Sequence, residues 1–293
     1  MPSTRDIRRR IKSVRNTAQI TKAMQMVASS KMQKAQQAAV NGRPFAELAN
    51  VIMHHAAAGA EDFTHPLLEP REVRKRGVIV VGTDKGLCGA LNSNLMREAA
   101  QDDAAATHYI AVGRKAAQFL ARVKRKLVAE FTYRDTPTYG ECQSIARCAR
   151  EMFITGEVDQ IEILFTRFIN TLSQRPERRV LLPLQREEML QAGFGRDTPT
   201  GEKAETRHVQ YLFEPSAGDV MEVLLSLFGD FQVAQVLLEA KASEHSARMV
   251  AMKNATDNAK ELIKDLTLEY NKMRQASITK ELLEISSAAM ALG

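Results

Sequence analysis

Apolar residues near the N-terminus follow the alternating four-three spacing of a coiled-coil helix. The stripe consists of Ile7, Ile11, Val14, Ala18, Thr21, Gln25, Ala28, Met32, Ala35 and Ala39. Small residues dominate it, so a second helix can approach closely. Ser3 and Asp6 have the spacing of a capping box, which starts the helix. Gly42 and Pro44 interrupt the pattern; we expect helical structure to resume after Pro44 and to end near Gly59.

A second helical stretch fills the C-terminal end. After Pro215 the chain has no proline and only Gly229 before the terminal Gly293. Ser216 and Asp219 again form a capping-box pattern, which predicts a helix of roughly 75 residues and about 110 Å. Its stripe contains Leu224, Leu227, Phe231, Ala234, Leu238, Met252, Ala255, Ala259, Leu262, Leu266, Met273 and Ala276.

Polar residues interrupt this second stripe. The same frame places Lys241, His245, Arg248, Glu269 and Lys280 in the stripe. A straight helix drifts by about 20° per heptad, which lets Met249, Ile263 and Tyr270 replace part of it. The pattern therefore predicts a long and irregular coiled coil.

The middle of the chain alternates short apolar runs with helical patterns. Strands are expected at 78–81, 109–113, 127–133, 161–168, 179–184 and 209–213, and helices at 92–103, 115–123 and 143–154. Ser173–Pro176 is expected to separate two of the strands, and 187–206 to form a loop. This alternation is typical of an α/β layer with a partly parallel sheet.

The predicted fold class is therefore α/β with long helices. An antiparallel coiled coil of the N- and C-terminal helices accompanies a central Rossmann-like domain, with boundaries at 1–58, 70–214 and 215–293. The longer C-terminal helix projects past its partner. Ile20, Met24 and Val27 give the first helix a second apolar face, which indicates a third body around the pair.

Composition narrows the possible functions. The 293 residues include no Trp, and 44% are hydrophobic. We find no apolar run long enough to span a bilayer. Cys88, Cys142 and Cys148 are odd in number and form no CxxC motif, which favours a reducing compartment and structural thiols over a redox pair. The formal net charge is +6, and residues 1–43 hold ten Lys and Arg against Asp6 alone, so an acidic partner is expected.

No catalytic set emerges from the sequence. Gly82, Gly86 and Gly89 follow a strand but lack the spacing of a Walker loop or GxGxxG, so a tight turn is favoured over a phosphate loop. The histidines show no metal-ligand spacing. We expect no catalytic residue, cofactor or metal. Two alternatives remain: a basic coiled-coil protein that binds nucleic acid, although no aromatic residue precedes Phe45 for base stacking, and a stand-alone nucleotide-binding α/β enzyme.

Several blocks of sequence resemble a known family in order and position. They are IRRRIKSVRNTAQITKAMQMVASSKM, VVGTDKGLCGALN, FINTLSQ, YLFEP and SEHSARMVAMKNATDNAKELIKDLTLEYNKMRQASITKELLEI. Together these blocks resemble the γ subunit of bacterial F-type ATP synthase, at both ends and the centre of the chain.

The resemblance implies a non-catalytic rotor shaft that couples ion-driven rotation of a membrane c-ring to ATP synthesis or hydrolysis. The implied partners are the α, β, ε and δ subunits and the c-ring, with no nucleic acid. Contact with the membrane would come only through the c-ring, at the cytoplasmic face of the bacterial inner membrane. The family's paired helices stand inside a ring of three α and three β subunits.

The resemblance also assigns contact residues. Lys22 and Met24 match shaft positions that face an acidic loop of β, and Arg248, Arg274, Gln275 and Thr279 match positions that touch the ring. Tyr211, Phe213 and Glu214 match the foot residues that meet the c-ring and ε. Ser286–Leu292 resembles the tip held in the apolar bearing of the ring. Phe213 stands where the family often has Tyr, and Gly82 replaces a small polar residue.

Overall fold

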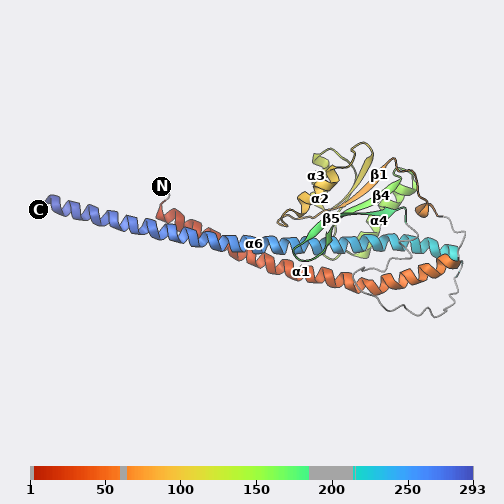
Figure 1. The fold of residues 1–293 in the computed structure, drawn as a ribbon, viewed down its shortest axis with the longest axis horizontal. Coiled ribbons are helices and arrows are strands. Elements are labelled where there is room, and N and C mark those ends of the chain that lie inside the picture. Colours follow the sequence, from red (N-terminus) through yellow and green to blue (C-terminus); the bar gives the residue numbers. More distant parts are fainter. Residues whose placement is uncertain (1–2, 60–64, 185–213, 215, 293) are drawn as a thin grey trace. The chain divides into compact units, whose positions relative to one another are not determined.

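Two long helices and one α/β domain make up the computed structural model, which describes residues 3–59, 65–184, 214 and 216–292. Helix α1 spans Thr4–Gly59 and helix α6 spans Ala217–Leu292 (Figure 1). The contacts divide the chain into two compact units. Unit 1 comprises Met1–Ser29 and Arg248–Gly293, and unit 2 comprises Ser30–Ala247.

The α/β domain lies within unit 2 and contains one five-stranded sheet. In chain order its elements are η1 (Pro66–Leu68), β1 (Arg76–Val81), α2 (Leu91–Ala100), β2 (Thr107–Val112), α3 (Arg114–Arg122), β3 (Lys126–Phe131), α4 (Tyr139–Ile154), β4 (Gln160–Phe168) and β5 (Gln174–Leu182). The strand order is β3-β2-β1-β4-β5, and only the β4–β5 pair is antiparallel. The predicted strand-helix alternation and partly parallel sheet are confirmed. The predicted strand 209–213 and loop 187–206 lie outside the described residues.

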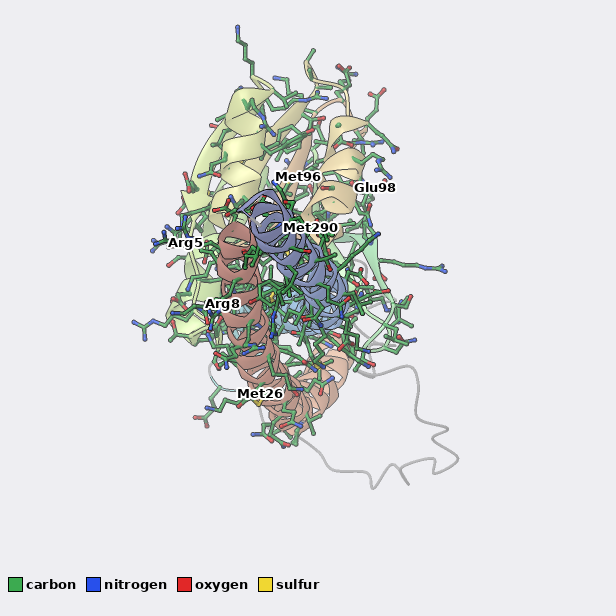
Figure 2. The ribbon with its side chains drawn as sticks, turned by 90° about the vertical axis from the view of Figure 1, so that its left-hand side faces the viewer. Arg5, Arg8, Met26, Met96, Glu98 and Met290 are labelled. Carbon is green, nitrogen blue, oxygen red and sulfur yellow. The ribbon has the colours of Figure 1, made fainter. Side chains whose placement is uncertain are left out.

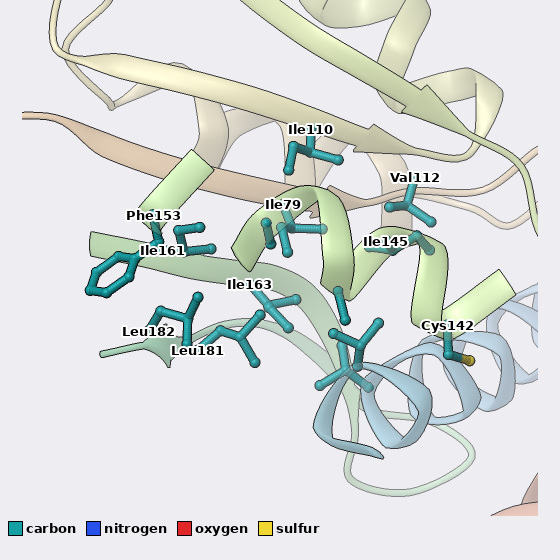
Figure 3. Packing of buried hydrophobic residues seen from close by; sticks show 14 of the residues in the cluster. Ile79, Ile110, Val112, Cys142, Ile145, Phe153, Ile161, Ile163, Leu181 and Leu182 are labelled. Atoms are coloured by element: carbon teal, nitrogen blue, oxygen red, sulfur yellow. The ribbon is translucent and has the colours of Figure 1, made fainter. Parts of the chain in front are cut away.

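Helices cover both faces of this sheet because its central strands are apolar on both sides. One face carries Val78, Val80 and Tyr109 and packs against Leu95 of α2 and Leu120 of α3. The opposite face packs against α4 and the first part of α6 in one continuous core (Figure 3), which includes Ile79, Ile110, Ile161, Ile163, Ile145, Phe153, Leu225 and Phe228. Helix α6 is therefore a structural layer of the α/β domain in unit 2.

Two proline positions differ from the sequence expectation. Ser173–Pro176 does not form the turn, because β5 already begins at Gln174. Pro176 is tolerated there since β5 is an edge strand, where a missing N–H costs no interior ladder bond. Pro44 does not interrupt the first helix, which is continuous to Gly59. Pro44 is exposed, and its missing N–H removes a single hydrogen bond from a helix of 56 residues.

The coiled-coil seam of α1 has the residues predicted for it. Ile7, Thr21, Ala28, Met32 and Ala35 are buried, and the other five stripe positions are half-buried. Thr21 Oγ1 lies 2.8 Å from Thr256 Oγ1 in unit 1, and in unit 2 a Cβ at Gly42 would lie 3.7 Å from the Phe231 ring. A later residue of α1 thus meets an earlier residue of α6, so the helices pair antiparallel as predicted.

The seam of α6 drifts away from the strict heptad frame. In unit 1 its inward positions are Met252, Thr256, Ala259, Ile263, Leu266, Tyr270 and Met273, which are buried or half-buried. Leu262 is 39% exposed and Ala276 is exposed, so placing them in the seam was wrong. Ile263 and Tyr270 occupy it instead, as the drift of a straight helix requires.

One expectation about hydropathy is also wrong. Helix α6 contains a stretch, within Gly218–Ser287, that is long and apolar enough to cross a membrane by length and composition. Half of that stretch is buried in the protein, and core helices of soluble proteins pass the same test.

Candidate partner-binding surface

The first turns of α1 present a basic surface in unit 1. Seven side chains are exposed along it: Arg5, Arg8, Arg9, Arg10, Lys12, Arg15 and Lys22. Arg5 and Arg8 lie at the start of the helix (Figure 2). Asp6, the single acidic residue of this surface, caps the helix: its carboxylate accepts hydrogen bonds from the Ser3 hydroxyl at 2.8 Å and from the Ser3 N–H at 3.2 Å. These hydrogen bonds lower the pKa of Asp6. The surface is therefore suited to an acidic partner.

An apolar strip adjoins the predicted contact residues Lys22 and Met24. Lys22 is exposed and donates to Gln25 Oε1 at 3.4 Å, and Met24 is half-buried. Ile20 is 60%, Met26 58% and Val27 56% exposed. The outward direction of Ile20 and Val27 agrees with a second apolar face. Met26, which the sequence analysis did not single out, is also exposed, about 100° further round the helix.

The predicted contact residues of α6 divide into two levels along the helix. Arg248 precedes Thr256, which pairs with Thr21, by eight residues, or about 12 Å at 1.5 Å per residue. Arg274 follows Thr256 by 18 residues, or about 27 Å. The structure therefore places Lys22, Met24 and Arg248 near one level and Arg274, Gln275 and Thr279 near another. The last three are exposed, and Thr279 Oγ1 donates to the Gln275 carbonyl at 3.0 Å.

Within the described part of the chain, no helix packs on the last turns of α6. Met273 is the last half-buried seam residue, which agrees with a C-terminal helix longer than its partner. Beyond it the exposed apolar side chains are Ile278 at 45%, Leu282 at 62%, Leu283 at 64%, Ile285 at 67% and Met290 at 82% (Figure 2). Contiguous exposed apolar surface marks a protein-protein contact. The sequence analysis predicted that the C-terminal helix projects past its partner, and these side chains lie on that projecting part.

The α/β domain holds α6 through buried polar contacts in unit 2. Arg150 of α4 forms an ion pair with Asp230 of α6, and its guanidinium donates to the Ser226 carbonyl at 3.0 Å. The Tyr139 hydroxyl donates to the second Asp230 oxygen at 3.1 Å. Burial, followed by the Asp230 charge, raises the pKa of Tyr139. Side chains far apart in sequence make these contacts, so no local pattern identified them.

The glycine-containing turn after β1 is a structural turn. Thr83 Oγ1 donates to the Lys85 carbonyl at 2.7 Å, and Asn92 Nδ2 donates to Thr83 Oγ1 at 2.8 Å. Asp84 Oδ1 accepts from the N–H of Arg114 at 3.1 Å, at the start of α3. The side chains of this turn therefore hold its shape and cap the start of α3, as expected for a tight structural turn.

In the part of the chain that the structure describes, neither the two thiols of α4 nor the His, Asp and Glu side chains form a reactive site. Cys142 is buried and Cys148 half-buried, both on α4. Burial raises the pKa of Cys142 to about 11 and also raises that of Cys148, so both thiols are protonated at neutral pH. Among the described residues, no group of three or more His, Cys, Asp or Glu could hold a metal ion.

Only one of the three residues predicted for the foot contact lies among the described residues. Glu214 is exposed, at a bend just before α6. Tyr211 and Phe213 lie outside the described residues.

Comparisons with known proteins show the family to which the chain belongs. A family model described as ATP synthase matches residues 3–292. The ATP synthase gamma chain of Opitutus terrae is 50% identical over 295 residues and covers 99% of both chains. That of Methylacidiphilum infernorum is 46% identical over 298 residues and covers 100% of both.

Solved structures show the same fold. A chain from the central stalk and c-ring of the Tetrahymena thermophila mitochondrial ATP synthase matches with a TM-score of 0.60 and 25% identity, over 80% of this chain and 99% of that one. A chain from the Euglena gracilis mitochondrial ATP synthase, in a structure of OSCP, F1 and c-ring, matches with a TM-score of 0.66 and 21% identity, over 99% and 94%. The chain therefore belongs to the gamma-chain family of ATP synthase, whose members are non-catalytic subunits that form the rotor shaft of the enzyme.

Proposed function

We propose that unit 1 turns inside a ring of three α and three β subunits, and that its exposed faces set the conformation of the catalytic sites. As a gamma chain, the protein is a component of the membrane-bound ATP synthase. The observation that carries the proposal is the bare, apolar end of α6, because a helix with Leu282, Leu283 and Ile285 each more than 60% exposed requires an enclosing partner.

Each predicted residue has a role in this arrangement. Lys22 and Met24 contact an acidic loop of β, which the basic surface of α1 attracts. Arg248, Arg274, Gln275 and Thr279 contact the ring at two levels. Tyr211, Phe213 and Glu214 form the foot contact with the c-ring and ε, and δ completes the complex. The enzyme lies at the cytoplasmic face of the bacterial inner membrane. The domain boundaries 1–58, 70–214 and 215–293 divide the chain into two shaft helices and a foot, and the first part of α6 also packs in the core of the foot.

The mechanism is differential contact. The faces of unit 1 differ in charge and apolar surface, so each rotation angle presents another surface to each β subunit. Only a difference in interaction free energy between two states shifts their equilibrium. Moving one site from 1:99 to 99:1 takes about 5.5 kcal/mol, which several modest contacts can supply together.

The test is ATP-driven proton pumping in inverted membrane vesicles that carry Arg274→Ala. Lys260→Ala is the matched control, because the Lys260 charge already pairs with Asp257 of the same helix at 3.1 Å. We expect Arg274→Ala to lower the pumping-to-hydrolysis ratio while assembly stays normal, and Lys260→Ala to leave that ratio unchanged. Wild-type pumping by Arg274→Ala would refute the assigned role.

Nucleic-acid binding is not favoured by the charge of α6. In unit 1 this helix carries seven Lys and Arg against six Asp and Glu, so the basic surface is confined to α1. A partner with acidic protein surface fits such a short basic segment without base stacking.

A further inference from the structure

A single side chain of the α/β domain contacts both long helices in unit 2. Asp135 lies between β3 and α4, and its Oδ2 accepts from Lys31 Nζ of α1 at 2.6 Å. Its Oδ1 lies 3.3 Å from Nε2 of His245 on α6, whose side chain is 3% exposed. The Asp135 carboxylate thus bridges α1 and α6.

The segment that carries Asp135 is anchored in the domain. Tyr133 is 5% exposed, and its hydroxyl donates to the Gly82 carbonyl, at the end of β1, at 3.5 Å. Lys241 of α6 places its ammonium 4.1 Å from the centre of the Tyr133 ring and pairs with Glu244 at 3.1 Å. Burial, then the carboxylates of Glu244, Asp84 and Asp135, raise the pKa of Tyr133, so its hydroxyl remains a donor.

Helix α6 is enclosed at this level. Every residue from 240 to 246 is buried, although Lys241, Glu244 and His245 are polar. A helix buried on all faces is surrounded by other elements. Burial opposes ionisation of Asp135, but the Lys31 hydrogen bond and the proximity of His245 and Lys241 lower its pKa, so it is a carboxylate at neutral pH.

We infer that Lys31, Tyr133, Asp135, Lys241 and His245, here called the Asp135 joint, transmit torque from the α/β domain into both helices at once. Other polar contacts described here join the domain to α6 alone: Arg150 with Asp230, Arg167 with Glu239 at 3.9 Å, and Ser246 with the Thr171 carbonyl at 2.9 Å. A contact between the α/β domain and α6 alone lets that helix twist against α1. A contact between the domain and both helices makes α1 and α6 turn together. The inference rests on the proposed coupling function.

The test is the angular fluctuation of single rotor complexes. A bead is attached to the α/β domain of the assembled α3β3γ complex through Val123→Cys, which is 43% exposed, with Cys148→Ser to prevent side labelling. The width of the bead's angular distribution during catalytic pauses reports torsional stiffness. Thermal variance is inversely proportional to stiffness. If the Asp135 joint supplies half of the torsional stiffness, Asp135→Asn is expected to increase the angular variance about twofold.

Three further variants make the result decisive. Glu72→Gln is the control, because its pair with Arg74 is 78% exposed on both sides, and it should leave the variance unchanged. Lys31→Gln should increase the angular variance as Asp135→Asn does, and it provides the same test if the Asp135→Asn complex does not assemble. The reversed pair Lys31→Asp with Asp135→Lys should restore part of the stiffness, which a merely structural role would not predict.

The outcomes distinguish a failure of the Asp135 joint from a failure of the proposed coupling function. If the control complex rotates and the angular variance is unchanged in Asp135→Asn and Lys31→Gln, the proposed role of the Asp135 joint is wrong and the rotor function still stands. A control complex that hydrolyses ATP without rotating overturns the coupling function itself.

Discussion

The buried pair of Arg150 and Asp230 provides a direct test of how α6 is held in unit 2. Asp230 has a side chain only 3% exposed, and that of Arg150 is 15% exposed. Arg150→Met removes the cation and leaves the carboxylate buried with only the Tyr139 hydroxyl as a described donor. Removing one partner of a buried pair costs about 3–5 kcal/mol, because the other charge is then uncompensated.

The same helix supplies a matched control. Arg147 of α4 lies 3.9 Å from Glu151, and both side chains are about 70% exposed. Exposed pairs of this kind contribute about 0–1 kcal/mol. Arg147→Met therefore removes the same chemical group from the same helix at a small cost, and the difference between the two variants measures burial.

The assay is urea unfolding of the full chain followed by circular dichroism. With a slope of about 3 kcal/mol per molar urea, Arg150→Met should lower the midpoint by about 1–2 M. The double variant Arg150→Met with Asp230→Leu should recover much of the loss, because an apolar pair replaces the ion pair. Equal midpoints for Arg150→Met and Arg147→Met would refute the reasoning.

Three further changes test other parts of the chain. Gly113→Ala should cost at least about 2 kcal/mol in urea unfolding, since φ is +98° and a Cβ would lie 2.5 Å from a carbonyl oxygen, whereas Gly86→Ala, with nothing within 4 Å, should cost little. Hydrogen bonds from backbone N–H groups lower the pKa of Asp159, so its contribution to folding stability is present above about pH 4 and is lost as the pH falls. Asp159→Asn should therefore make the unfolding free energy less dependent on pH in the acid range, and an unchanged dependence would contradict this. A maleimide at pH 7 should label half-buried Cys148 before buried Cys142; the reverse order by peptide mapping would show that burial does not control access.

Periodicity predicted the parts of the fold that depend on local sequence. The ten stripe positions of α1 are buried or half-buried because mainly small residues repeat at coiled-coil spacing across about nine helical turns. The frame of α6 failed at Leu262, which is 39% exposed, while Ile263 took its place. A strict heptad needs supercoiling to persist, and a straight helix moves off it.

Contacts between distant residues could not be predicted this way. Asp135 is one of several polar residues in a turn-like segment, and nothing local indicates that it meets Lys31, 104 positions earlier. The start of β5 was missed because Pro176 suggests a turn, and only the strand order shows that it lies at a sheet edge. The contact residues of the shaft came from family resemblance, and their exposure alone does not distinguish them from other exposed residues of α6.

The polar interruptions in the α6 stripe have a physical cause in this fold. Lys241 and His245 fall in the coiled-coil frame, where apolar residues would pair best with α1. Both are buried, at 2% exposure each, and both contact the segment of Tyr133 and Asp135. A stripe of apolar residues alone could let α6 slide or rotate against its neighbours, because apolar packing is non-directional. Charged and hydrogen-bonded contacts fix the position of α6 along and around its axis. At the level of Lys241 and His245, α6 therefore packs as a layer of the α/β domain and not only as one helix of a coiled coil.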